Sequence, residues 1–249
     1  MSVALIRAEI AKMRRLRTGI IVLVMVVGVT ALAVLSALSS PDFSDPGTRS
    51  WAALLAGMSL AVPLTSPLLL AVLASRQVDI EHHGNGWLLF QTSGATRGGL
   101  CRAKLAVLGA VVCAVTAAEA GLVLLAGIAL AVPGPPPLAL WWGYAGAVAV
   151  VNLVLLGLHI LISARVENQL AGLGIGVLGT LLAVFATGLP PLLAHLTPWG
   201  YYALATAAGY RDGELVTFVP GYASIAALAV LGGVLFAVFT TRFDRREAS

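Results

Sequence analysis

Charged residues are scarce in this sequence. They make up 10% of the 249 residues, whereas 59% are hydrophobic and the mean hydropathy is +0.96. A soluble domain carries roughly 25% charged residues, because charged side chains cover much of its surface. The shortage therefore excludes a water-soluble globular protein and predicts an integral membrane protein.

Lysine is scarcer still, since only Lys12 and Lys104 occur. Neither lies in the Gly-x-x-x-x-Gly-Lys-Ser/Thr pattern that cradles nucleotide phosphates, so the chain cannot hydrolyse ATP by that route. The sequence also lacks a Gly-x-Ser-x-Gly elbow and a His-Glu-x-x-His helix, which argues against a hydrolase or an intramembrane protease. We expect no enzyme activity, no catalytic residue and no cofactor in this chain.

Cysteine is limited to Cys101 and Cys113, which are too few for a disulfide framework and are expected to be free thiols. The acidic and histidine cluster Glu81-His82-His83 does not predict a metal site, because adjacent histidines point to different faces and no second cluster faces them. The net charge of +4 does not predict nucleic-acid binding, because the basic residues flank apolar runs.

Long apolar runs are abundant. A run of about 20 apolar residues is enough to cross a membrane as a helix. Six runs meet this length, and they predict an all-α integral membrane protein with a single transmembrane domain over residues 1–249: 20–38, 51–74, 105–132, 140–162, 170–189 and 222–240. The first run exceeds the apolar core of a signal peptide, so we interpret it as an anchor.

The basic residues predict the orientation, because loops that stay in the cytoplasm are rich in arginine and lysine. Only Arg49 and Arg211 fall on the outer side if the N-terminus is inside. The other thirteen fall inside: Arg7, Lys12, Arg14, Arg15, Arg17, Arg76, Arg97, Arg102, Lys104, Arg165, Arg242, Arg245 and Arg246. We therefore expect a multi-pass protein of a bacterial cytoplasmic (inner) membrane with both termini in the cytoplasm.

The N-terminal segment, residues 3–17, has a helical pattern. Its apolar stripe holds Val3 and three further residues, and its arginines lie mostly off the stripe. This pattern is typical of a helix that lies flat at the membrane surface and contacts lipid. We expect this interfacial role for Ile6, Ile10, Met13, Arg14, Arg15 and Arg17; a simple positively charged anchor remains the alternative.

The segment from Ser75 to Lys104 is longer than a connection needs. An acidic and histidine start leads to an apolar patch at 87–90 and then to a turn rich in small residues. An aromatic anchor flanked by charges is typical of an interface helix, so this segment is expected to dock on a partner protein. The residues expected in this contact are Glu81, His82, Gly86, Trp87, Leu88, Leu89, Phe90 and Arg97.

Two further features lie in or near the spans. The stretch from Pro190 to Leu204 is apolar but broken by prolines, which predicts re-entrant or interfacial helices that form an outer gate or simply fill space. Glu119 lies within a span, where a carboxyl group is costly unless it is protonated, partnered or exposed to water. We expect Glu119 and Asn152 to line a translocation path, with a structural role as the alternative and Asn152 or His159 as partners of the carboxyl.

Two stretches resemble the motifs of one family. Residues 81–89 are similar to an acidic-x-x-Gly-x-x-Trp-x-x-Leu run, and residues 97–104 to an Arg-x-x-x-x-x-x-Lys start of the next span. These stretches and the overall layout resemble the membrane subunit of ABC-2 type ATP-binding-cassette transporters, in particular the lantibiotic-immunity-like permeases. One departure is the run Ser93 to Thr96, which stands where a proline often precedes the arginine.

The resemblance implies an interfacial N-terminal connecting helix, a cytoplasmic coupling helix between spans two and three, and re-entrant helices between spans five and six. It also implies an exporter subunit that moves an amphipathic or hydrophobic peptide, lipid-like molecule or drug. The implied partners are an ABC ATPase dimer that binds ATP and magnesium, a second permease subunit in a homo- or heterodimer, and membrane lipids. Two alternatives stay open: a non-transporting assembly or sensor protein, and a proton-coupled secondary transporter that uses Glu119.

Overall fold

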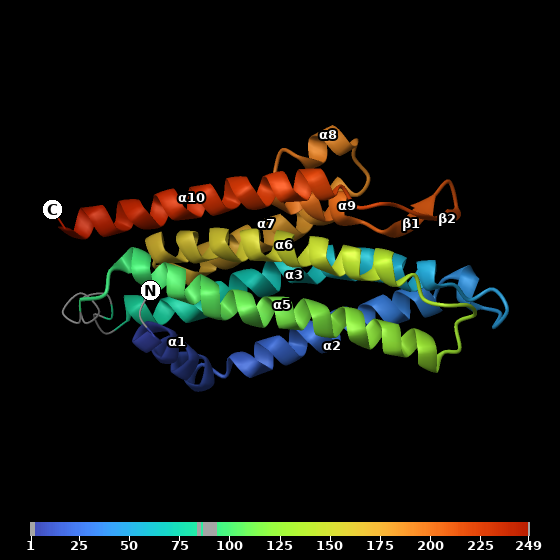
Figure 1. Cartoon of the computed structure of the whole chain (residues 1–249), viewed down its shortest axis with the longest axis horizontal. Helices are drawn as coiled ribbons and strands as arrows, with labels where there is room; N and C mark the ends of the chain where they lie inside the picture. The colour runs from blue at the N-terminus through green and yellow to red at the C-terminus, as the bar shows by residue number, and fades with distance from the viewer. Residues whose placement is uncertain (1–2, 84–85, 87–93, 249) are drawn as a thin grey trace.

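The structure is an elongated helical bundle. The computed structural model describes residues 3–83, 86 and 94–248. Six helices in these ranges are long and apolar enough to cross a membrane, and they run side by side along the long axis (Figure 1). Their bounds are Thr18–Leu38 for α2, Trp51–His82 for α3, Arg97–Ala129 for α5, Leu138–Arg165 for α6, Gln169–Ala186 for α7 and Tyr222–Ala248 for α10.

The six apolar runs are confirmed as helices, and three of the helices extend well beyond their runs. α10 continues eight residues past the predicted end at Thr240. α3 continues eight residues past the predicted end at Ala74, and α5 begins eight residues before the predicted start at Leu105. The Thr96 hydroxyl caps α5 by accepting from the Gly99 amide at 3.1 Å. Apolar length therefore located the membrane crossings but underestimated the polar helical ends.

The α3 helix forms the centre of the bundle and packs against α2, α6 and α7. Two glycines allow close contact. A Cβ on Gly57 would lie 2.2 Å from the Ala33 carbonyl oxygen of α2, and one on Gly176 of α7 would lie 2.6 Å from the Ala71 Cβ. Glycine at these positions lets α2 and α7 approach α3 closely, as small residues do between membrane helices.

The two ends of the bundle differ. α1 (Val3–Arg15), the last turns of α3, the first turns of α5 and the C-terminus gather at one end, which we call the terminal end (Figure 1). The N-terminal helix predicted over residues 3–17 is confirmed over residues 3–15. It turns into α2 at Arg17, whose φ of 53° is left-handed.

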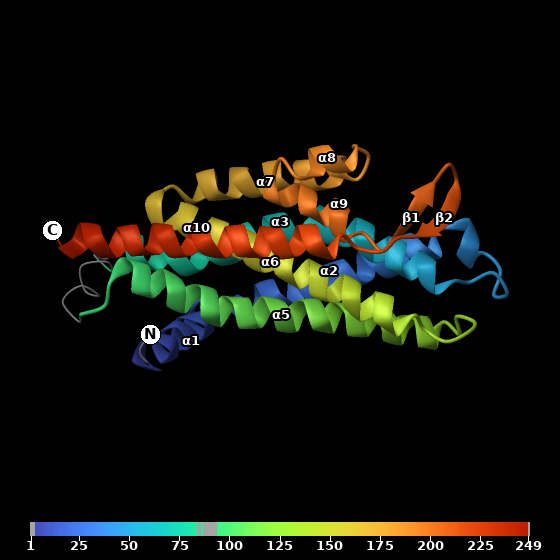
Figure 2. The same cartoon turned by 45° about the horizontal axis from the view of Figure 1, so that its top comes forward.

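The opposite end, which we call the hairpin end, carries short elements between α7 and α10 (Figure 2). The expected short helices are present as α8 (Pro191–Ala194), the 3-10 turn η2 (Pro198–Gly200) and α9 (Tyr201–Ala205). An antiparallel hairpin of β1 (Ala208–Arg211) and β2 (Glu214–Thr217) follows, with Arg211 opposite Glu214. This hairpin was not predicted from the sequence.

A short 3-10 turn, η1 (Pro41–Phe43), lies in the connection between α2 and α3. Both cysteines are free thiols, as expected, with Cys101 buried and Cys113 half-buried.

Candidate functional site

A buried cluster of charges joins three helices at the terminal end. Lys104 of α5 lies at its centre with a fully buried side chain. Its Nζ donates to Glu9 Oε2 of α1 at 2.9 Å and to the Gln77 carbonyl oxygen of α3 at 2.6 Å. The same ammonium lies 3.0 Å from Glu81 Oε2. We call Glu9, Lys12, Gln77, Glu81 and Lys104 the charge cluster.

The second lysine completes the cluster. Lys12 Nζ donates to Glu9 Oε1 at 2.6 Å and also to Glu81 Oε1. Gln77 adds a hydrogen bond from an uncharged side chain, because its Nε2 donates to Glu9 Oε2 at 3.1 Å. Two ammonium groups thus neutralise two carboxylates. A charged group is stable away from water only when it is paired in this way.

Helical spacing explains why the partners converge. Glu9 and Lys12 are three residues apart on α1, and Gln77 and Glu81 are four residues apart on α3, so each pair shares one helix face. Lys104 lies two turns into α5. α1 is therefore fixed to α3 and α5 by ionic contacts and not only by apolar packing.

Charge pairing dominates the ionisation of the α1 residues. Burial by itself raises the pKa of the Glu9 carboxyl, but Lys104 and Lys12 outweigh burial and lower that pKa below its usual value. Burial likewise lowers the pKa of Lys12, but Glu81 and Glu9 outweigh it and raise that pKa. Both shifts favour the charged forms that hold the cluster together.

The cluster was missed at the sequence level. Glu9 was not identified, and Lys104 was assigned only to the start of a span. One signal was available: Glu9 is the only acidic residue before Asp42, in a segment with four arginines and a lysine. A lone carboxylate in a basic amphipathic helix, one turn from a lysine, indicates an internal partner.

The predicted docking residues take several positions. The Glu81 side chain is fully buried in the charge cluster, where it contacts Lys12 and Lys104, and its contact with a partner stays a prediction. Arg97 is half-buried in the first turn of α5. A Cβ on Gly86 would lie 2.8 Å from the Glu81 Cα, so only glycine fits there. The apolar patch Trp87, Leu88, Leu89 and Phe90 lies outside the described residues.

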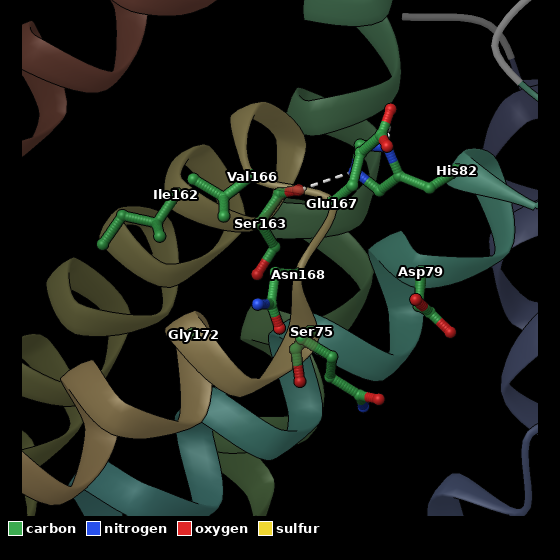
Figure 3. A pocket seen from close by; sticks show the side chains of 10 residues that line it. Ser75, Asp79, His82, Ile162, Ser163, Val166, Glu167, Asn168 and Gly172 are labelled. Atoms are coloured by element: carbon green, nitrogen blue, oxygen red, sulfur yellow. Dashed lines mark hydrogen bonds and ion pairs between the residues drawn. The ribbon is translucent and has the colours of Figure 1, made fainter.

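His82 connects the end of α3 to the link between α6 and α7. Its Nε2 donates to the Ser163 carbonyl oxygen at 2.8 Å, and its Nδ1 lies 3.9 Å from Glu167 Oε1. Figure 3 shows these residues around a narrow pocket, with Asp79 on the α3 side. The His82 side chain is only 8% exposed, so it also faces the bundle more than a partner.

The membrane-embedded polar residues form a second group. Asn152 of α6 donates to Thr116 Oγ1 of α5 at 3.2 Å and accepts from the Tyr202 hydroxyl of α9 at 2.5 Å. These two hydrogen bonds attach the short α9 helix to the middle of the bundle. Glu119 is 2% exposed, and its Oε1 has no hydrogen-bond partner among the described residues.

Asn152 bonds to Thr116 and Tyr202, and no hydrogen bond between Asn152 and Glu119 is found among the described residues. His159 lies edge-on to Trp199, with ring centroids 6.3 Å apart.

A cavity of about 630 Å³ lies at the hairpin end. It is bordered by α2, α3, the end of α7, α9 and the hairpin, and its lining is mostly apolar. The polar side chains in the lining include Ser36, Ser59, Thr187, Thr206 and Arg211. Its volume falls in the range of about 300–1,000 Å³ that is typical of small-molecule sites. Glu119 and Asn152 are not among its lining residues.

Comparison with known protein families matches residues 5–183 to the family described as ABC-2 family transporter protein. The match covers more than half of the chain and includes every member of the charge cluster. The chain belongs to the ABC-2 transporter family. A comparison with curated proteins finds no match.

Family membership gives the charge cluster its context. An ABC-2 protein of this kind is the membrane permease of an ABC transporter; it is a transport component and not itself catalytic, and the family implies partnering with an ABC ATPase. The charge cluster borders the segment between α3 and α5, whose motifs resemble those of a coupling helix. The permease thus has a buried ionic junction where that segment joins the bundle.

Proposed function

We propose that this ABC-2 permease is an exporter subunit of a bacterial cytoplasmic membrane, with both termini in the cytoplasm. It moves an amphipathic or hydrophobic cargo outward, powered by a separate ATPase dimer that binds ATP and magnesium. The observation that carries the proposal is the charge cluster, because it ties the base of the coupling segment to α1. The positive-inside distribution of arginine supports the orientation.

In this mechanism, ATP-driven closure of the ATPase dimer displaces residues 75–104. The charge cluster transmits this displacement, because Lys104 and Glu81 hold the two helices that flank the segment and Glu9 holds α1. α1 is joined to α2 by a two-residue link, so α2 moves with it. His82 passes the same movement to α6 through Ser163.

The cargo path lies between two permease subunits in a homo- or heterodimer. The apolar lining of the 630 Å³ cavity supports an amphipathic or hydrophobic cargo, because such a surface gains free energy by covering apolar groups. Its position at the hairpin end suits release on the outer side of the membrane.

Co-purification tests the ATPase contact. Trp87→Glu with Leu88→Glu is expected to abolish co-purification of the ATPase while the permease keeps its thermal stability. The matched control is Val166→Glu, an exposed apolar position in the neighbouring α6–α7 link, which is expected to leave co-purification intact. Unchanged recovery of the ATPase with the double variant would contradict the docking role.

Transport direction needs a separate measurement. Permease and ATPase reconstituted in inside-out vesicles are expected to accumulate a fluorescent amphipathic peptide in the lumen when ATP is added outside. ATP-dependent loss of peptide from the lumen would contradict export. Accumulation that follows a pH gradient without ATP would instead favour a proton-coupled transporter.

A further inference from the structure

The outward face of α1 carries three arginines and no acidic residue, and a fourth arginine follows in the link to α2. Arg7, Arg14, Arg15 and Arg17 are all exposed. Among the described residues, no hydrogen bond or ion pair involves their side chains. The only acidic residue of α1, Glu9, faces inward and is neutralised there by Lys12 and Lys104.

This separation of charge types is a feature of the fold. Both lysines of the chain form ion pairs in the charge cluster, whereas the arginines of α1 are exposed on its outward face. A guanidinium group suits phosphate better than an ammonium does, because it binds two oxygens at once in a fixed plane. Asp79, a nearby acid, lies on the other side of α3 and lines the pocket beside Ser163 and Glu167.

Covalent geometry places this face at the depth of the lipid headgroups. α1 ends at Arg15 and α2 begins at Thr18, so the two helices are separated by about 7–11 Å of chain at most. α2 exposes apolar side chains from its first turn, with Ile20 57% and Leu23 61% exposed. The hydrocarbon layer must begin there, and α1 lies just outside it.

The apolar residues on the same face support this placement. Val3 is 66% exposed and Ile10 is 44% exposed, and they alternate with Arg7 and Arg14 at spacings of three and four residues. Ile6 and Met13, which the sequence assigned to the lipid-facing stripe, are half-buried, and Met13 packs against the core. The stripe is therefore rotated toward the arginines because Glu9 and Lys12 occupy the inward face.

We propose that the outward face of α1 binds the phosphates of anionic phospholipids in the adjacent leaflet through Arg7, Arg14 and Arg15, with Val3 and Ile10 inserted between the headgroups. This interaction requires only that α1 lies at a membrane surface. It does not depend on the cargo, the direction of transport or the ATPase. Its failure is therefore distinct from failure of the proposed export function.

The test uses the full chain in nanodiscs of phosphatidylcholine alone and of phosphatidylcholine mixed with phosphatidylglycerol. The wild type is expected to melt at a higher temperature with phosphatidylglycerol and to retain that lipid in native mass spectrometry. Arg7→Gln with Arg14→Gln and Arg15→Gln is expected to lose the preference by about fivefold per arginine. Lysine at the same three positions keeps the charge, so part of the preference is expected to remain.

Two controls show whether the preference belongs to α1 and to phospholipid. Arg242→Gln with Arg245→Gln removes exposed arginines of α10 at the same end and is expected to keep the wild-type preference. Inorganic phosphate added to the detergent-solubilised protein is expected to produce no thermal shift.

Three results would overturn the proposal: a lipid preference that survives the triple glutamine variant, an equal loss in the α10 control, or a free-phosphate shift as large as that of the lipid. Added salt gives a measurement on the unaltered protein, because it screens exposed charges. The wild-type preference is expected to weaken as salt rises, and a preference independent of salt would also contradict the proposal.

Discussion

Lys104 of α5 donates to Glu9 of α1 across 2.9 Å, and both side chains are fully buried. The two residues are 95 positions apart in the chain. Their contact fixes α1 to the first turns of α5, so movement of either helix alone would separate charges in a water-poor site. This cost makes the two elements a single mechanical unit.

Removal of the central ammonium is therefore predicted to be severe. Lys104→Met leaves Glu9 and Glu81 with only Lys12, and loss of one partner of a buried ion pair costs about 3–5 kcal/mol. The free energy of unfolding in a denaturing-detergent titration is expected to fall by this amount. The matched control is Arg102→Met, whose ion pair with Asp244 is partly exposed and contributes about 0–1 kcal/mol. Equal losses for the two variants would contradict the role of the buried cluster.

The pH dependence of stability follows from the α1 residues. The pKa of Glu9 is lowered, so its contribution is complete above the unfolded value of about 4.3 and is lost as pH falls through the lower folded value. The pKa of Lys12 is raised, so its contribution is complete below about 10.4 and is lost as pH rises through the higher folded value. Thermal melts are expected to show a plateau between these limits.

The Glu9→Gln variant provides the comparison for the acid side. Its melting temperature is expected to be lower at neutral pH and to approach that of the wild type as the pH falls below about 4.3, because protonation of Glu9 then leaves a neutral side chain in the wild type, as glutamine does in the variant. A constant difference between the two proteins throughout the acid range would show that Glu9 does not act through its charge.

The membrane crossings were predictable because the information is local. Each apolar run, such as residues 20–38 or 140–162, carries its own signal in about 20 consecutive residues. The charge cluster was not, because the partners of Lys104 come from residues 9, 77 and 81 and no local pattern specifies that pairing. Similarly, the depth of Asn152 did not reveal that the hydroxyl of Tyr202 would reach it.

The hairpin, although it was not predicted, has a local signal in the sequence. Asp212 and Gly213 have φ values of 54° and 85°, the left-handed pair that a two-residue hairpin turn requires. The Asp-Gly pair between Tyr210 and Leu215 indicates this turn in the sequence. The predicted interfacial helices end at Leu204, and no element was predicted for residues 208–217.

His82 is predicted to act as a strut at the end of α3. His82→Ala removes the hydrogen bond to the Ser163 carbonyl and is expected to cost about 1 kcal/mol of stability. Its larger effect is expected on coupling, as a fall in transport per ATP hydrolysed, because the link between the end of α3 and the end of α6 would be weakened. The control is His83→Ala, since the His83 side chain is 75% exposed. An unchanged ratio of transport to ATP hydrolysis in the His82→Ala variant would contradict this role of His82.

The attachment of α9 is predicted to depend on one hydroxyl group. Tyr202→Phe leaves the ring in place but removes the donor to Asn152 Oδ1, so a buried acceptor loses its partner at a cost of about 1–3 kcal/mol. Faster hydrogen exchange of residues 201–217 is expected at the same time. Tyr201→Phe is the matched control, because no hydrogen bond of the Tyr201 hydroxyl is found among the described residues. The prediction fails if both variants exchange alike.

Variants of Glu119 distinguish a structural role of this intramembrane carboxyl group from a place in a translocation path. Glu119 is a buried residue of α5 within a single subunit, and it does not line the cavity at the hairpin end. A carboxyl group so enclosed serves packing better than conduction, so Glu119→Gln, which keeps the shape and removes the titratable proton, is expected to retain ATP-driven transport within about twofold. Glu119→Ala also removes side-chain volume, so its thermal stability compared with that of Glu119→Gln measures the packing contribution of the side chain. Transport measured in proteoliposomes that disappears in the glutamine variant, while the fold melts normally, would instead assign Glu119 to a proton or substrate path.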